Sequence, residues 1–547
     1  MSAETQPHED QRDRAPLKHP GLLVAVTPVV VLIVLLGINV ALFGADSSFG
    51  PNQIALLFAA AMAGGLGAWR GIPMATMVAG AEDAIRSALK AILILLLIGA
   101  LAGTWMMSGI VPAMIYYGLD ILNPRIFLVA ATIICAVVSL ASGSSWSTVA
   151  TVGIALLGIG TSLGISQPMA AGAIISGAYF GDKVSPLSDT TNLASAMAGI
   201  DLVRHIRYLL WTTVPSFLIA LLLYLVIGLR AEPTTTANVA ALKVEVASHF
   251  DTLSPWLLVV PVAVLGLVVA RFDAIAALFM GAVLAGLLAI VAQPTVVGRI
   301  SGAEPEPVDV ANDEQRDGSS WLYAKQAYMA LIQSMAFETR LVNGDQEASW
   351  QQQWDAMARP DDEASTPLSA EQIRLQSKLS VAQLLRGKGM VGMLNTVWLI
   401  LSAMCFGGFM HACGFLERIS EPLLQATRSE GGLVATTTGS CLFTNVTASD
   451  QYLAIVVPGQ MFKRAFADRG LAPENLSRTL EDSGTVTSVL VPWNTCGAAQ
   501  AGVLGVATVL YAPFCFFNLL SPIMTVLVGA VGFRLARLSN DENPTRG

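Results

Sequence analysis

The sequence predicts an all-α polytopic membrane protein built from two repeated halves, and three observations support this. Apolar residues make up 54% of the 547-residue chain and charged residues only 13%, about half the charged share of a soluble protein. The apolar residues gather in uncharged blocks long enough to cross a bilayer, which takes about 20 residues. Polar, hydroxyl-rich motifs interrupt these blocks at corresponding places in the two halves.

The apolar blocks mark the candidate membrane segments. The first, 21–43, contains no ionisable residue at all. It is too long for the apolar core of a signal peptide and follows a polar stretch of 20 residues, so we interpret it as a membrane helix. The other candidate segments are, in chain order, 54–69, 91–110, 208–229, 255–270, 274–291, 393–410 and 511–533.

Polar stretches between these segments divide the chain into six parts. They are a polar N-terminal tail (1–20), a first membrane half with repeat 1 (21–230), a linker with connecting membrane helices (231–295), an acidic extramembrane insertion (296–388), a second membrane half with repeat 2 (389–535) and a C-terminal tail (536–547). Long surface insertions cost little free energy, so we expect the insertion, with its acidic run at 361–363, to be tolerated or regulatory. The alternative is a receptor or scaffold whose insertion binds a partner.

Basic residues at the ends of the chain predict its orientation. Arg12, Arg14 and Lys18 precede the first segment, and Arg534 and Arg537 follow the last one. Because loops rich in lysine and arginine stay in the cytoplasm, we expect both termini there, in a bacterial cytoplasmic (inner) membrane. If the polar motifs form re-entrant hairpins and broken spans, the chain crosses the membrane ten times. This topology also puts five other basic residues on the cytoplasmic side: Arg204, Arg207, Arg271, Lys463 and Arg464.

The motif GDKVSPLSDTTN at 181–192 interrupts two apolar stretches. Pro186 removes a backbone donor and disfavours helix at Ser185, so the motif predicts a helix, an unwound segment and a second helix. Asp189 followed by Thr190 is typical of a helix start. Unwound backbone at membrane depth survives only inside protein or along a wet cavity. Its carbonyls, with nearby hydroxyls and carboxylates, are the hard oxygen ligands that suit a small cation such as sodium.

The two aspartates of this motif have different neighbours. We expect Asp182 to take part in the site; the alternative, to which the neighbouring Lys183 points, is an aqueous end of the segment, where Asp182 would pair with the lysine or cap a loop. Asp189 begins the polar cluster 189–192, and we expect it to bind the ion rather than only to cap a helix. A buried carboxylate can hold a proton or a cation but not both well. In a site open to one side at a time, that competition gives obligatory exchange.

A hydroxyl-rich segment precedes this motif. The sequence GSSWSTVATVG at 143–153 carries Ser144, Ser145 and Ser147, among other hydroxyls. Its density of hydroxyls and its flanking glycines favour a re-entrant tip that lines the site. The alternative is that these hydroxyls bond back to carbonyls of their own membrane helix.

The second half repeats this order of features. An apolar helix precedes TTTGSCLFTNVTASDQ (436–451), in which Asn445 and Asp450 match the hydroxyl-rich segment of the first half. Asp450 lies either at the site or in water at the base of a hairpin. Residue numbers differ by about 300 between the halves, which pairs Asp182 with Asp482. Paired interruptions of this kind are typical of inverted repeats with the binding site at their interface.

The motif LEDSGTVTSVLVPWNTCG at 480–497 is the second-half counterpart of the aspartate motif. Pro492 breaks a helix shortly before Asn494 and Thr495, and we expect both side chains to supply oxygens to the site. Asp482 stands among other charged residues, which indicates the membrane interface. A role for Asp482 in the site is the alternative.

Several function classes are excluded by the sequence. No nucleotide-binding, hydrolase or zinc-protease motif occurs in a suitable context, so we expect no enzymatic activity and no cofactor. Since a Walker A motif is absent, we expect ion gradients rather than ATP to drive transport. The net charge of −8 argues against a nucleic-acid partner, and the six cysteines form no CxxC pair that would hold zinc or a disulfide framework.

At these motifs the sequence resembles the NhaC family of sodium/proton antiporters. The resemblance rests on GSSWSTVATVG, AGAIISGAYFGDKVSPLSDTTNLA, SDQYLAIVVPGQMF and LSRTLEDSGTVTSVLVPWNTCG, and it spans roughly residues 50–230 and 385–533. It implies two inverted repeats with re-entrant hairpins and an elevator-type motion of a transport domain against a scaffold, whose surfaces commonly pair into a homodimer. Members of this family also exchange small organic acids or amino acids.

These observations lead to one main functional prediction and one alternative. We expect a secondary antiporter that exchanges sodium for protons; the alternative is a sodium-coupled transporter or exchanger of a small organic acid or amino acid, held by helix N-termini. The expected sodium ligands are Asp189, Asn192, Asn494 and Thr495. The full set of candidate site residues adds Ser144, Ser145, Ser147, Asp182, Thr190, Thr191, Asn445, Asp450 and Asp482.

Overall fold

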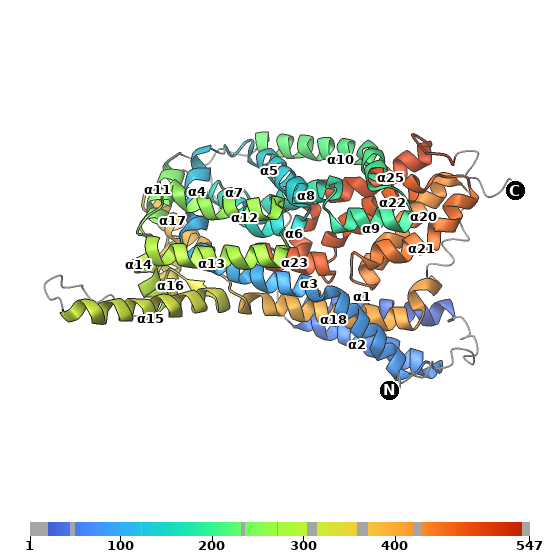
Figure 1. The fold of residues 1–547 in the computed structure, drawn as a ribbon, viewed down its shortest axis with the longest axis horizontal. Coiled ribbons are helices and arrows are strands. Elements are labelled where there is room, and N and C mark those ends of the chain that lie inside the picture. Colours follow the sequence, from blue (N-terminus) through green and yellow to red (C-terminus); the bar gives the residue numbers. More distant parts are fainter. Residues whose placement is uncertain are drawn as a thin grey trace, which may run out of the picture.

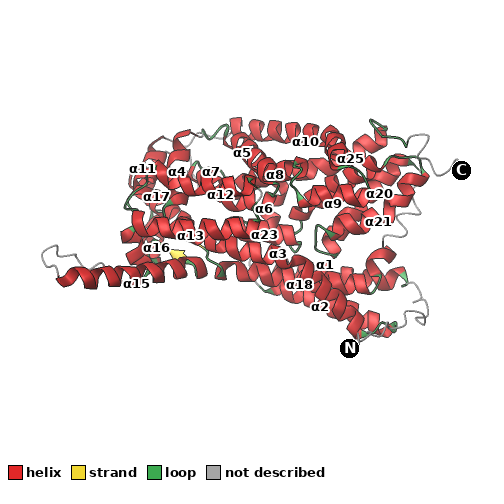
Figure 2. Cartoon of the chain, viewed as in Figure 1, coloured by secondary structure: helices red, strands yellow, loops and turns green. Residues whose placement is uncertain are grey.

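The computed structural model describes residues 20–43, 47, 50–121, 123–230, 236–270, 272–302, 314–357, 370–419 and 429–538. The predicted all-α class is confirmed, because 83% of the described chain is helical and only two short strands occur in it (Figures 1 and 2). Within it, seven helices are long and apolar enough to cross a membrane, and the bent pair Thr495–Leu504 and Thr508–Phe514 would add an eighth. Arg271, the acidic run at 361–363 and most of both predicted tails lie outside the described residues.

One group of long apolar helices packs around α3 (Met74–Met107) and is called the α3 group below. Close contact between α3 and α18 is possible because both helices carry glycine where they cross. A Cβ atom added at Gly408 of α18 would lie 2.6 Å from the backbone oxygen of Gly80 in α3. In Figure 1, α1, α2, α3 and α18 occupy the lower right. The other members of the group are α1 (Leu22–Phe43), α2 (Pro51–Trp69), α13 (Ala274–Ala292) and α18 (Leu394–Ala412).

The first repeat is a helical hairpin followed by a broken helix. The hairpin turns at Gly143, whose φ of 67° lies in the left-handed region that glycine adopts without strain. The broken helix is interrupted over 185–188, around the predicted Pro186. Its elements are α4 (Ile110–Ile121), α5 (Phe127–Ser142), α6 (Ser145–Thr148), η2 (Val149–Gly153), α7 (Ile154–Ser162), α8 (Gln167–Val184), α9 (Asp189–Ala198) and α10 (Leu202–Arg230).

The second repeat follows the same order. A hairpin turns at residues 448–452, and the broken helix is interrupted over 491–494, around the predicted Pro492. In Figure 1 most helices of the two repeats lie above the α3 group, and the repeats meet where α10 and α8 pack on α25 and α10 packs on α22. The elements are α20 (Glu430–Thr447), α21 (Leu453–Asp468), α22 (Pro473–Leu480), η6 (Glu481–Thr485), η7 (Ser488–Leu490), α23 (Thr495–Leu504), α24 (Thr508–Tyr511), η8 (Ala512–Phe514) and α25 (Phe516–Val531).

Helix starts, rather than residue identities, define how the two repeats correspond. Ser144 and Asp450 both accept hydrogen bonds from the first backbone N–H groups of the helix that follows, and their numbers differ by 306. Ser188 and Asn494 do the same and also differ by 306. Ser, Asp and Asn are interchangeable helix caps, so identity is a poor guide here. The predicted match of Asp182 with Asp482 therefore differs from the structure, which places Asp482 in the middle of its helix.

The remaining helices connect the two repeats. The described residues between 296 and 388 are mostly helical, with a two-stranded antiparallel pairing of β1 (Thr339–Arg340) and β2 (Arg386–Gly387). In Figure 1, α15 projects at the lower left, yet its C-terminal part packs on α3. The connecting elements are α11 (Thr236–Ala247), η3 (Pro255–Leu258), α12 (Val259–Val269), α14 (Pro294–Ile300), α15 (Glu314–Ala336), α16 (Gly344–Ala356), α17 (Ala370–Leu384) and η5 (Val391–Met393).

The contact of α15 with α3 gives a stability prediction. A methyl group added at Gly103 of α3 would overlap the backbone oxygen of Ser334 in α15, and backbone cannot give way as a flexible side chain can. We expect Gly103→Ala to lower the free energy of unfolding by about 1–3 kcal/mol. The matched control is Gly65→Ala in α2, where nothing lies within 4 Å of the added atom.

Thermal unfolding of the purified variants in detergent measures this effect. The control should be as stable as the wild type or slightly more so, because alanine favours helix over glycine by about 0.5–1 kcal/mol. Equal transition temperatures for Gly103→Ala and Gly65→Ala would contradict the close packing of this part of the insertion against α3.

Candidate ion-binding site

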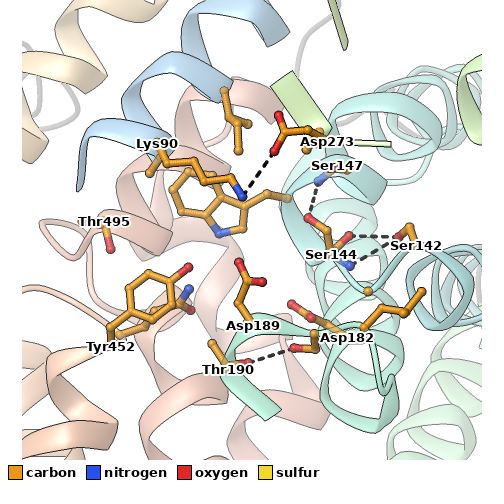
Figure 3. A pocket seen from close by; sticks show the side chains of 18 of the residues that line it. Lys90, Ser142, Ser144, Ser147, Asp182, Asp189, Thr190, Asp273, Tyr452 and Thr495 are labelled. Atoms are coloured by element: carbon orange, nitrogen blue, oxygen red, sulfur yellow. Dashed lines mark hydrogen bonds and ion pairs between the residues drawn. The ribbon is translucent and has the colours of Figure 1, made fainter. Parts of the chain in front are cut away.

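The hairpin tips of both repeats, the helix break of the first repeat and the start of α23 in the second meet at one cavity of about 370 Å³ (Figure 3). The first repeat contributes residues of its hairpin tip and of the 185–188 break. The second repeat contributes its hairpin tip and the start of α23, and the α3 group closes the opposite wall. Lining residues with polar side chains are Ser87, Lys90, Ser142, Ser144, Trp146, Ser147, Asp182, Ser188, Asp189, Thr190, Asp273, Asp450, Gln451, Tyr452 and Thr495.

Four helices of the two repeats begin at this cavity: α6, which continues into η2 and α7, then α9, α21 and α23. The first N–H groups of a helix lack partners within it, and the helix dipole places partial positive charge at the same end. Each start is capped, for example by Ser144 Oγ, which accepts from Ser147 N at 3.2 Å. The cavity thus combines helix starts, which suit an anion, with carboxylates, which suit a cation.

Asp182 joins the first hairpin tip to the helix break. It is 8% exposed, and its Oδ2 accepts hydrogen bonds from Ser145 N at 3.1 Å and Ser145 Oγ at 2.7 Å. The alternative of an aqueous position for this segment is wrong, because the neighbouring Lys183 is completely buried. Asp182 therefore pairs with the hairpin tip instead of with Lys183.

Asp189 is the first residue of α9, and Ser188 rather than Asp189 caps that helix. The Asp189 side chain is exposed to the cavity, and within the described chain its carboxylate has no hydrogen-bond or ion-pair partner. Figure 3 draws it beside Asp182, across from Lys90 and Asp273. An unpartnered carboxylate that faces an open cavity can bind a cation.

The three residues after Asp189 form hydrogen bonds with different partners. Thr190 lines the cavity and donates its hydroxyl hydrogen bond to Glu481 Oε1 at 3.1 Å. Thr191 donates to the backbone oxygen of Lys183 at 3.0 Å, and the Asn192 amide donates to the backbone oxygens of Pro186 and Ser188. Thr191 and Asn192 therefore hold the break in shape and do not line the cavity.

In the second repeat, Asp450 lies at the cavity and not in water at a hairpin base. It is 2% exposed, its Oδ1 accepts from the N–H groups of Tyr452 and Leu453, and its Oδ2 lies 3.5 Å from Thr495 Oγ1. The turn before it contains Ser449 with a φ of 60°, a conformation uncommon outside glycine. Thr495 N donates to Ser449 O at 2.9 Å, which joins this hairpin tip to the start of α23.

Asn445 and Asn494 form a buried amide pair behind the cavity. Asn494 Nδ2 donates to Asn445 Oδ1 at 3.0 Å, and its own Oδ1 caps α23 at Cys496 N. Asn445 Nδ2 donates to the backbone oxygen of Gly484 at 2.7 Å. The pair connects the hairpin, the π-helical η6 and α23, and neither residue lines the cavity.

Asp482 is buried rather than interfacial, and it forms an ion pair with Lys183 across the two repeats. Both side chains are 0% exposed. Thr212 Oγ1 donates to Asp482 Oδ2 at 2.7 Å, Thr525 donates to the same oxygen, and Lys183 also donates to Ser521 Oγ at 2.6 Å. The charges surrounding Asp482 in sequence suggested the membrane interface, but the partner that allows its burial lies 299 residues away.

The predicted residues therefore fall into three sets. Those that line the cavity are Ser144, Ser147, Asp182, Asp189, Thr190, Asp450 and Thr495. Ser145 contacts the cavity residue Asp182. Those placed behind the cavity, where they hold the breaks and hairpins, are Thr191, Asn192, Asn445, Asp482 and Asn494.

Four further functional candidates were missed by sequence reasoning. Gln451 and Tyr452 line the cavity directly after Asp450, at positions that correspond to Ser145 and Trp146, so alignment of helix starts would have found them. Lys90 and Asp273 lie in no motif, and nothing in their local sequence indicates a site.

A polytopic helical protein whose two repeats place four helix starts and several carboxylates around one cavity belongs to the class of ion-coupled membrane transporters. Comparison with known proteins gives the family. The model of the Na⁺/H⁺ antiporter family matches residues 177–301 and 370–533, which include both helix breaks. The chain belongs to the NhaC family of Na⁺/H⁺ antiporters.

Curated relatives are similar over most of their length. The chain is 36% identical to the Na⁺/H⁺ antiporter NhaC of Alkalihalophilus pseudofirmus, over 83% of this chain and 85% of that one. It is 32% identical to the arginine/ornithine antiporter ArcD of Halobacterium salinarum, over 97% and 96%. It is 31% identical to the malate-2H⁺/Na⁺-lactate antiporter of Bacillus subtilis, over 92% and 94%. All three are antiporters and none is named as an enzyme, so the family supports antiport without fixing the solute.

Proposed function

We propose that this protein exchanges sodium for protons across a bacterial cytoplasmic membrane, with both termini in the cytoplasm. The observation that carries the proposal is the carboxylate of Asp189, which faces the cavity with no partner within the described chain. The relatives named as Na⁺/H⁺ antiporters support the choice of ions.

Sodium would bind between the two repeats. Asp189 supplies the negative charge, and the hydroxyl of Thr495 and backbone oxygens at the hairpin tips complete an all-oxygen shell. Asn192 and Asn494, which the sequence suggested as direct ligands, would act by holding the two breaks in shape. The carboxylate releases its proton when it binds sodium, and it releases sodium when it binds a proton. A site that is open to one side of the membrane at a time would therefore exchange the two ions.

The motion would follow from the two-part architecture. The cavity lies between the repeats and the α3 group, so a displacement of the repeats along the α3 group would carry the site from one side of the membrane to the other. The broken helices and hairpins would move as one body because Asp182, the Asn445–Asn494 pair and the Lys183–Asp482 pair connect them.

The proposal is tested with purified protein in sealed proteoliposomes that contain a pH dye. Sodium added outside should move protons without any organic solute. Asp189→Asn, which keeps the shape of the side chain and removes its charge, should reduce the initial rate at limiting sodium at least tenfold, about 1.4 kcal/mol or more. Surface residue Glu371 offers a matched control, because Glu371→Gln removes an exposed carboxylate that does not line the cavity.

Two results would count against this proposal. Full activity of Asp189→Asn would show that the carboxylate is not part of the site. Proton movement that requires an organic solute would show that sodium is not exchanged for protons alone.

A second candidate function is exchange of a small organic acid or amino acid. The volume of about 370 Å³ favours it, because a dehydrated sodium ion needs far less and small-molecule sites begin at about 300 Å³. Four helix starts would hold a carboxylate, and Asp189 would hold sodium or an ammonium group. Malate, lactate, arginine and ornithine, the solutes in the names of two relatives, form the test panel in the same proteoliposomes. Uptake of a labelled solute against its counter-solute would favour this candidate.

A further inference from the structure

The α3 group contributes an ion pair to the cavity wall that faces the repeats. Lys90 Nζ of α3 lies 3.6 Å from Asp273 Oδ2 at the start of α13. Both side chains line the cavity and are about half exposed, at 58% and 55%. In Figure 3 the pair is drawn opposite Asp189 and Asp182, which belong to the first repeat. The pair is therefore in the cavity but outside the motifs that form the candidate site.

The two members of this pair are held differently. Asp273 caps α13, with its Oδ1 accepting from Ile275 N at 2.9 Å, so its carboxylate has a fixed position. Lys90 has a long flexible side chain and makes this ion pair at the outer end of the normal range. The ammonium group can consequently move between Asp273 and the centre of the cavity.

Lys90 differs from the other lining residues in its charge. Within the described chain, it is the single cationic side chain of the cavity wall, against the carboxylates of Asp182, Asp189, Asp273 and Asp450. An ammonium group inside the same cavity repels a sodium ion and competes with it for unpartnered carboxylates such as Asp189. Asp273 opposes both effects, because it attracts the cation and holds the ammonium group at the wall.

We propose that the Lys90–Asp273 pair determines the sodium affinity of the cavity, with Lys90 weakening sodium binding and Asp273 strengthening it. This inference rests on the proposed sodium site at Asp189. It adds a specificity-determining element on the α3 group, separate from the ligands that the repeats supply. The pair would keep the affinity low enough for sodium to be released after it has been carried.

Single and double substitutions test the proposal through the KM for sodium. Lys90→Gln removes the competing charge, and we expect the KM to fall about threefold to tenfold. Asp273→Asn keeps a good helix cap, removes a negative charge and releases Lys90, so the KM should rise by a similar factor. The double variant Lys90→Gln/Asp273→Asn should return to within about twofold of the wild type.

The readout is sodium-dependent proton movement in proteoliposomes at fixed pH and ionic strength. A KM does not depend on how much of the protein is correctly folded, so partial loss of folded protein cannot imitate the effect. Matched controls lie on the same helix: Arg86→Gln and Asp83→Asn remove one charge of each sign at positions that do not line the cavity. Their KM values should stay within about twofold of the wild type.

Opposite shifts in the two single variants, with recovery in the double variant, support the proposal. A structural role would change both single variants in the same direction, and that result overturns it. Equal shifts in Lys90→Gln and Arg86→Gln also overturn it, because they would reflect general surface charge. If the wild type shows no sodium-dependent proton movement, the proposed function itself fails. Normal wild-type exchange with an unchanged KM in Lys90→Gln refutes this inference alone.

Discussion

Lys183→Met is expected to be among the most destabilising single substitutions in this protein. It would leave the Asp482 carboxylate fully buried, with hydroxyl donors from Thr212, Ser521 and Thr525 but no positive charge. Removing one partner of a buried ion pair typically costs about 3–5 kcal/mol, because the remaining charge is uncompensated. Asp482→Asn should cost a similar amount, since it leaves the Lys183 ammonium group without its counter-ion.

The double variant Lys183→Met/Asp482→Asn separates the charge effect from the loss of packing. It contains no buried charge, and an asparagine oxygen in the place of Asp482 Oδ2 can still accept from Thr212 and Thr525 while its amide nitrogen donates to Ser521 Oγ, so it should be more stable than either single variant. Thermal unfolding in detergent, compared with Glu371→Gln on the surface, measures all three. If the losses of the two single variants simply add in the double variant, the ion pair is not what holds these repeats together.

Asp182→Asn is expected to cause the largest loss of transport with a folded protein. The carboxylate accepts from both the backbone N–H and the hydroxyl of Ser145, and hydrogen bonds to a charged group contribute about 1.5–3 kcal/mol each. Asparagine removes the negative charge. In one of its two side-chain orientations, its NH2 group would also face the N–H and hydroxyl donors of Ser145. Since this contact joins the hairpin tip to the helix break beside Asp189, we expect the transport rate to fall at least a hundredfold, about 2.7 kcal/mol.

Ser145→Ala is the graded control for this prediction. It deletes the hydroxyl donor and keeps the N–H donor, so the rate should fall only about tenfold. Initial rates in proteoliposomes at equal protein content give the comparison, and size-exclusion profiles report the fold. A rate for Asp182→Asn that equals that of Ser145→Ala would mean that the negative charge of Asp182 has no part in transport.

Much of the fold could be predicted because its causes are local. The uncharged block at 21–43 must be helical in a bilayer, because only a helix or a closed barrel satisfies its backbone there. Pro186 and Pro492 mark the two breaks because proline lacks the backbone donor that a continuing helix needs. The hairpin tip at Gly143 follows equally from a residue that tolerates positive φ.

The candidate site could be predicted only in part. Asp189, Thr190 and Thr495 line the cavity because they stand at helix starts that the breaks themselves create. Asn192 and Asn494 have the same chemistry in the same motifs, yet their amides bond to nearby backbone and to another amide. The direction in which a polar side chain points depends on which hydrogen-bond partner lies within about 3 Å. The residues of its own motif do not determine that partner.

The sequence by itself determined the membrane class, the repeated order of hairpin and broken helix, and the residue types available at each helix start. Those properties depend on hydrophobicity, backbone sterics and capping over a few neighbouring residues. Only the tertiary structure decided that Lys183 is buried against Asp482, that Lys90 and Asp273 face the cavity, and that Gly103 meets Ser334. Each of these contacts joins segments far apart in the chain, so the packing of whole helices, and not the local sequence, sets which charges meet.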